Sequence, residues 1–142
     1  MNNRKLDDID TQILKQLEED GRRSYRQIAE KLNLSVGTIT NRVHKLKNEG
    51  IIKGFQLELD YTQLGYNIET IIELDLNGKL EDITNKYPDN IISAHKTTGQ
   101  YDGLLITRFT DTQELNHFLE KLTKEENVEK TYTRLILNKI QT

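Results

Sequence analysis

The sequence predicts an α+β protein of two small domains. A helix-turn-helix domain of the winged-helix-like kind is expected over residues 1–50, a linker strand over 51–65, and a ferredoxin-like βαββαβ domain over 66–142. Two observations support this division. Apolar residues recur at helical spacing in the first third of the chain and then change to the alternation typical of strands. Charge is also divided: residues 22–53 carry eight Lys and Arg against two Glu (net +6), and residues 61–142 carry nine against thirteen acids (net −4).

The composition excludes several classes of protein. There is no cysteine among the 142 residues, which rules out a disulfide framework and a thiolate metal site. No apolar run approaches the ~18 residues of a membrane span, and the N-terminus has no apolar signal core, so a cytoplasmic protein with no membrane partner is expected. Two domains in a chain of this length have thin cores, because a small domain buries only about 60% of its unfolded surface. Help from a partner subunit is therefore expected.

Local signals place three short helices in the first domain. Ser24 has the character of an N-cap, and Gln27 completes a capping box three residues later. Asn33 follows the second helix at a position where a left-handed turn residue is expected. Ser35 caps the third helix and Gly50 ends it. The first helix is indicated by apolar residues at helical spacing, which are Leu6, Ile9, Ile13, Leu14 and Leu17.

The third helix has two unlike sides. Its apolar side holds Val36, Ile39, Val43 and Leu46. The opposite side holds Gly37, Thr38, Asn41, His44, Lys45 and Asn48, with no acid among them. A solvated surface helix is the plainer interpretation, but such faces usually mix Glu with Lys. Gly37 costs the helix up to ~1 kcal/mol relative to alanine, and close approach by another molecule is a reason to accept that cost.

Duplex DNA is a partner that suits this side of the helix. The major groove admits a helix, and Asn, Thr and Lys offer groups that suit base edges and phosphates. Nearby arginines extend the positive surface, although Arg23 has the alternative of bracing the helix-turn-helix core. The residues predicted to contact DNA are Arg22, Arg23, Ser24, Arg26, Ser35, Gly37, Thr38, Thr40, Asn41, Arg42, His44 and Lys45.

The rest of the chain has the element order of the ferredoxin-like fold. Phe55, Leu57 and Leu59 alternate with polar residues and predict a strand. Beyond it, strands are expected over 68–76, 90–96, 103–109 and 128–140. The two helices are expected around Leu80–Tyr87, where Pro88 stops the first, and around Leu115–Leu122. Strand, helix, strand, strand, helix, strand gives an antiparallel sheet with both helices on one face.

The ordered motifs resemble those of the Lrp/AsnC "feast/famine" transcription regulators. The matching stretches are "LDDID", "DGR", "LS", "NRVHKLKNEGIIKG", "TTGQYDGLL" and "EKTYTRLILNKI", and together they cover residues 6–140. The resemblance implies a sequence-specific, nucleoid-associated regulator of double-stranded DNA. Its second domain (called the RAM domain in this family) would sense a small amino acid and form dimers that assemble to octamers or higher. The strand "FQLELD" would pair across the dimer. No cofactor beyond a free amino acid is implied.

The loop "TTGQYD" between two predicted strands has two interpretations. By composition it is an ordinary turn, in which Asp102 bonds local backbone. By resemblance it lines the effector pocket between dimers, where Asp102 would accept from the ammonium of an amino acid. Arg134 would pair with an acidic ligand or fill the site and leave it without an effector. The residues predicted to bind the effector are Thr98, Gly99, Gln100, Tyr101, Asp102, Thr133, Arg134 and Leu135.

Two other functions remain as alternatives. Sirohaem decarboxylases resemble the same two-domain family, and His95 precedes the sensing loop. An effector-independent protein that organises DNA is the second alternative. Catalytic residues and a metal site are not expected, because His44, His95 and His117 lie on three different elements and no nucleophile or phosphate-binding motif is present.

Overall fold

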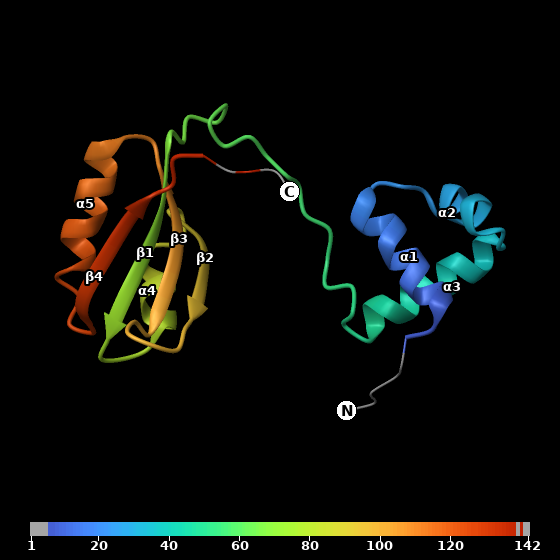
Figure 1. The fold of residues 1–142 in the computed structure, drawn as a ribbon, viewed down its shortest axis with the longest axis horizontal. Coiled ribbons are helices and arrows are strands. Elements are labelled where there is room, and N and C mark those ends of the chain that lie inside the picture. The colour runs from blue at the N-terminus through green and yellow to red at the C-terminus, as the bar shows by residue number, and fades with distance from the viewer. Residues whose placement is uncertain (1–5, 139, 141–142) are drawn as a thin grey trace. The chain divides into compact units, whose positions relative to one another are not determined.

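The computed structural model describes residues 6–138 and 140, and its elements are labelled in Figure 1. The chain divides by its internal contacts into two units, Met1–Glu58 and Leu59–Thr142. The first unit contains three helices, and the second contains a four-stranded sheet with two helices. Residues 51–58 thus belong with the helices, although the sequence assigned them to the linker.

The first unit consists of α1 (Asp8–Glu19), α2 (Tyr25–Leu32) and α3 (Val36–Asn48). Each helix begins at a side-chain cap because the first turn has backbone N–H groups without helical partners. Asp7 caps α1 and Ser24 caps α2, both as reciprocal capping boxes.

The turns between these helices also follow the sequence. Ser35 caps α3, as predicted from its position. Asn33 adopts φ 55°, the left-handed conformation predicted for the turn after α2. Gly50 follows α3 with φ +72°, which suits a helix end. The core between the helices is made of Ile13, Leu17, Ile28, Ala29, Ile39, Val43 and Leu46.

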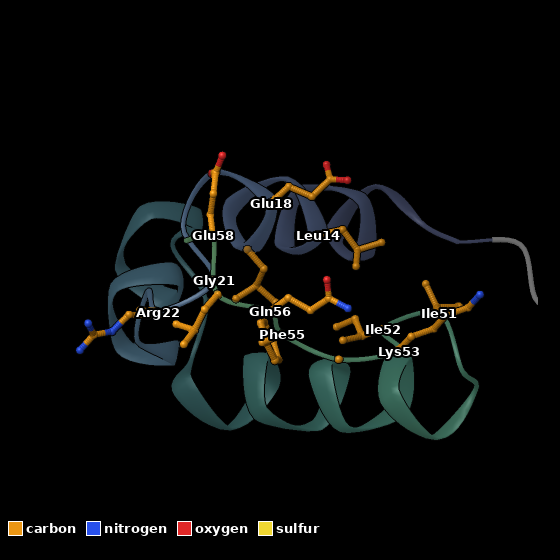
Figure 2. A pocket seen from close by; sticks show the side chains of 13 residues that line it. Leu14, Glu18, Gly21, Arg22, Ile51, Ile52, Lys53, Phe55, Gln56 and Glu58 are labelled. Carbon is orange, nitrogen blue, oxygen red and sulfur yellow. The ribbon is translucent and has the colours of Figure 1, made fainter. Parts of the chain in front are cut away.

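The strand predicted at residues 55–59 is absent from this chain. Residues 51–67 contain no strand, because a strand needs a neighbouring strand and none pairs with this segment in the described part of the chain. Leu57 is 80% exposed, and Phe55 and Leu59 are also exposed. Figure 2 shows the segment passing alongside α1, where it forms one wall of a groove in the first unit. Phe55 lies against Gly21 there, and a Cβ added to that glycine would come within 3.2 Å of the ring.

The second unit has the predicted βαββαβ order. Its elements are β1 (Ile68–Leu76), α4 (Leu80–Lys86), β2 (Ile91–Lys96), β3 (Gly103–Phe109), α5 (Thr112–Leu122) and β4 (Val128–Leu135). The strands lie in the order β2-β3-β1-β4, and every neighbouring pair is antiparallel (Figure 1). This is the predicted ferredoxin-like arrangement. The last strand ends at Leu135, short of the predicted residue 140; residue 139 lies outside the described part of the chain.

One face of the sheet carries the core of the second unit. Thr70 and Thr107 lie directly opposite each other on this face, fully buried, with their hydroxyl oxygens 2.6 Å apart. Both helices pack against the same face. The buried apolar cluster is Ile72, Leu74, Leu80, Ile83, Leu105, Phe109, Leu115, Phe118, Leu122 and Val128.

The opposite side, here called the open sheet face, carries Ile71, Glu73, Leu104, Ile106 and Arg108. These residues alternate along β1 and β3 with the buried ones and are partly exposed. Two tyrosines cover one end of the face: the Arg108 guanidinium lies 4.0 Å from the ring centroid of Tyr61 and 4.9 Å from that of Tyr66.

Candidate DNA-contact and effector sites

The polar side of α3 is exposed, as its spacing predicted. We define the α3 outer face as Gly37, Thr38, Asn41, His44, Lys45 and Asn48. All but the half-buried Thr38 are exposed, whereas Ile39, Val43 and Leu46 on the other side are fully buried. Gly37 is an open position, since a Cβ there would meet only the Ser35 hydroxyl at 3.9 Å. The face is therefore free of protein contacts that would require a glycine.

The predicted hydroxyl residues already have structural partners. Ser35 Oγ accepts from the Thr38 backbone N–H at 3.1 Å and lies 2.8 Å from the Thr38 hydroxyl. Thr40 donates to the Val36 carbonyl at 2.9 Å. Ser24 Oγ accepts from the Gln27 N–H at 3.2 Å. These side chains fix the starts of α2 and α3, and any contact with DNA is additional to that role.

Two of the predicted arginines project into solvent. Arg26 pairs with Glu30 at 3.3 Å, but both side chains are largely exposed, so the pair contributes little and the guanidinium stays available. Arg22 follows the turn after α1, and its backbone N–H donates to Asp20 Oδ1 at 2.9 Å. Its side chain points away from the groove in Figure 2. Both positions suit contacts with phosphates.

Arg23 and Arg42 are instead bound inside the first unit. Arg23 Nη1 donates to the Gln16 backbone carbonyl at 3.3 Å and pairs with Glu19 at 3.1 Å. It adopts the bracing alternative, and it holds the pKa of the Glu19 carboxyl below its usual value through their hydrogen bond. Arg42 pairs with Asp7, and with Asp10 at 3.1 Å. Sequence reasoning gave no sign of the Arg42 contacts, because they join residues far apart in the chain.

The loop between β2 and β3 is held by its own backbone and by β1. Thr97 N–H donates to the Asp102 carbonyl at 2.9 Å, and Thr97 Oγ1 donates to the Tyr101 carbonyl at 2.6 Å. Asp102 Oδ2 accepts from the Leu76 N–H at 2.9 Å, a bond to the end of β1 and not to the local backbone of the turn. Gly99 has φ +117°, a conformation that side chains rarely adopt. Thr98, Gly99 and Gln100 are exposed at the tip.

The structure separates the predicted residues of the last strand. Thr133 pairs with Ile72 and Leu135 with Thr70, so both lie on the helix-covered face. Arg134 pairs with Ile71 and lies on the open sheet face. Consecutive residues of a strand point to opposite faces, so Arg134 and its two neighbours do not line one face of this sheet together.

Two residues that sequence reasoning missed complete the cluster around Arg134. Its guanidinium pairs with Glu73 at 3.0 Å and lies 4.9 Å from the centroid of the Tyr132 ring. Tyr132 in turn stacks on Tyr101 from the loop, with centroids 6.4 Å apart. The sequence contained a signal for Tyr132. Tyr132 and Arg134 alternate with Thr131 and Thr133 along the strand, and this alternation places both on the same face of the sheet.

No metal centre is found in the part of the chain that the structure describes. None of its groups of His, Cys, Asp and Glu could hold an ion. His95 hydrogen-bonds to Ser93 at 3.1 Å and is exposed. Within residues 6–138 and 140, no helix is long and apolar enough to cross a membrane.

A capped three-helix unit with an acid-free exposed helix face, followed by a βαββαβ domain, defines a helix-turn-helix DNA-binding regulator. Residues 6–53 match the model of the winged helix-turn-helix DNA-binding domain, and residues 72–142 match that of the Lrp/AsnC ligand-binding domain. The chain belongs to the Lrp/AsnC family of transcriptional regulators.

Relatives and solved structures agree with this assignment. An uncharacterized HTH-type transcriptional regulator of Pyrococcus furiosus is 40% identical over 136 residues, which cover 93% of this chain and 91% of the relative. The structure of Bacillus subtilis LrpC is 30% identical, with a TM-score of 0.87 over 98% of this chain and 99% of LrpC. A Neisseria meningitidis regulator in complex with L-methionine shares the fold, with a TM-score of 0.88 at 23% identity over 97% of this chain and 94% of that one.

Proposed function

We propose that the α3 outer face binds the major groove of double-stranded DNA and gives the regulator its sequence preference. The observation that carries this proposal is the exposure of Asn41, His44 and Lys45 on a side of α3 without acids. Asn can bond to an adenine edge and Lys to guanine or phosphate. Arg22 and Arg26 extend the positive surface toward the DNA backbone.

The test uses Asn41→Ala and Lys45→Ala, with a duplex selected from random sequences by the parent protein. Each variant should bind this duplex weaker by about 1–3 kcal/mol for a lost base contact, and a lost phosphate contact should reduce the salt slope by about 0.9. Lys124→Ala, an exposed lysine of the second unit, is the matched control and should bind as the parent does. Equal binding by all three variants and the parent would refute the proposal.

We further propose that a small amino acid modulates this binding from the loop at residues 97–102. The loop's backbone N–H groups suit a carboxylate, and Asp102 Oδ1 suits the ammonium, since Oδ2 already bonds to Leu76. Of the predicted strand residues, Arg134 is the one connected to the loop: its guanidinium lies over the Tyr132 ring, and Tyr132 stacks on Tyr101. The L-methionine complex of the Neisseria regulator supports an amino acid as the ligand class.

A thermal-shift titration with each of the twenty amino acids tests the effector. A ligand at one hundred times its dissociation constant should add about 2.7 kcal/mol to the free energy of unfolding. A protein that responds to none of them would instead fit the DNA-organising alternative. Visible absorbance of the purified protein, or a shift of the absorption bands of sirohaem when the protein is added, would indicate the enzyme alternative, and we expect neither.

The exposed apolar residues of the segment 55–59 favour a homodimer as the working unit. Phe55, Leu57 and Leu59 alternate on an exposed segment outside the sheet, and strand pairing with the same segment of a second copy would bury these side chains. Sedimentation should show a dimer or a higher assembly such as an octamer, and Leu57→Asp should lower the mass. A parent protein that sediments as a monomer at all concentrations would contradict this.

A further inference from the structure

Arg42 ties the middle of α3 to the first turn of α1. One nitrogen of its guanidinium, Nη1, donates to both Asp7 and Asp10, which lie 35 and 32 residues earlier in the chain. The Asp10 side chain has no exposed surface, and that of Arg42 is 26% exposed. The ion pair is thus partly shielded from solvent and screened less than a surface pair.

The placement of the two acids explains why an arginine is needed. Asp7 is the N-cap of α1, and Asp10 is the third residue of that helix, so both carboxylates lie near the positive end of its dipole. Burial of the Asp10 carboxylate removes it from water, and a buried charge needs a partner of opposite sign. Arg42 supplies positive charge to this carboxylate from a different helix.

The contact also restricts how α3 can turn about its own axis. Arg42 directly follows Asn41 in the helix, so the two side chains are separated by about 100° around the axis. Holding Arg42 on α1 therefore determines where Asn41 points. A guanidinium whose Nη1 is bound to two carboxylates of α1 has its charge largely compensated, so it attracts a phosphate less than the exposed Arg22 or Arg26 does.

We propose that Arg42 is a positioning residue for DNA binding, which sets the rotation of α3 through Asp7 and Asp10, and does not itself contact DNA. This inference rests on the proposed role of the α3 outer face. It replaces the sequence-based expectation that Arg42 binds DNA directly. Arg42 then acts through Asn41 and Lys45, the residues proposed to touch the duplex.

The experiment compares Arg42→Gln, Asp10→Asn and the double variant in the full-length protein. Melting temperature is measured by circular dichroism, and affinity for the selected duplex is measured at several salt concentrations. Arg42→Gln leaves the buried Asp10 carboxylate without this partner, so its melting temperature should fall by about 5 °C or more. Its affinity should fall by about tenfold, with the salt slope of the parent retained.

The double variant distinguishes the two roles of Arg42. It has no buried carboxylate left to compensate, so its melting temperature should recover relative to Arg42→Gln, whereas its DNA affinity should stay low because the contact that fixes the rotation of α3 is still missing. The proposal is overturned if Arg42→Gln melts as the parent does and loses about 0.9 from the salt slope, or if the double variant recovers both stability and the DNA affinity of the parent. Lys45→Ala serves as the reference: if it binds as the parent does, the DNA-contact face itself is wrong, whatever the Arg42 melting data show.

Discussion

Gly37→Ala should make the protein more stable and at the same time a weaker DNA binder. The substitution adds a Cβ on α3 that would meet only Ser35 Oγ, at 3.9 Å, which is ordinary van der Waals contact. Alanine loses less backbone entropy on folding than glycine, worth about 0.5–1 kcal/mol inside a helix. Because Gly37 lies in the first turn, the lower value applies, and for a unit of this size it should raise the melting temperature by roughly 2–4 °C.

The effect on DNA binding should have the opposite sign. Gly37 lies on the α3 outer face, and the added methyl group is directed at the surface that we propose to lie against the duplex. A loss of about tenfold in affinity, equivalent to about 1.4 kcal/mol, is expected if the backbone approaches the DNA closely at this position. Thermal denaturation and binding to the selected duplex, measured on the same preparation, give both quantities.

Asn116→Ala is the matched control for added helix stability. Asn116 is exposed on α5 in the second unit, and replacing it by alanine also favours the helix. It should raise the melting temperature without changing DNA affinity. If Gly37→Ala is more stable and binds DNA as tightly as the parent, then close approach of DNA is not the reason for this glycine, and our interpretation of the face is wrong.

Two further predictions concern the second unit. Thr107→Val should lower the free energy of unfolding by about 1–3 kcal/mol, because it leaves the buried Thr70 hydroxyl without its partner. The Thr70→Val/Thr107→Val double variant should be nearly as stable as the parent, because neither hydroxyl is then left alone. Additive losses of the two substitutions on urea denaturation would contradict this. Burial and the hydrogen bond to Glu125 raise the pKa of Tyr87 to about 12, from 10 for the free side chain. The contribution of protonated Tyr87 to the free energy of unfolding is therefore complete below about pH 10 and is lost as pH rises toward 12. Tyr87→Phe should remove this loss when the free energy of unfolding is measured against pH.

Local features of the fold were predictable because their causes are local. The caps at Ser24 and Ser35 depend on residues within three positions, and the left-handed turn at Asn33 depends on one side chain. The βαββαβ order also follows from periodicity along short stretches. The exposed side of α3 is of this kind, since helical spacing alone separates Asn41 from Ile39 and Val43.

Contacts across the chain were not predictable in the same way. Arg42 appeared as one more basic residue near DNA, because nothing in the neighbouring sequence reveals that Asp7 and Asp10 lie against it. Thr133 and Arg134 were assigned to one pocket wall from a motif, although a strand places them on opposite faces. The strand at residues 55–59 was wrong for the single chain, because alternation of apolar and polar residues does not show whether a neighbouring strand is present.

That uncovered segment has a consequence for the newly synthesised protein. Residues 55–59 leave the ribosome before the sheet domain is complete, and an exposed stretch of alternating apolar residues can pair with unrelated nascent chains. Charged neighbours such as Lys53 and Asp60 oppose such mispairing. Strong overexpression at high temperature should therefore favour inclusion bodies, and slower synthesis should favour soluble yield.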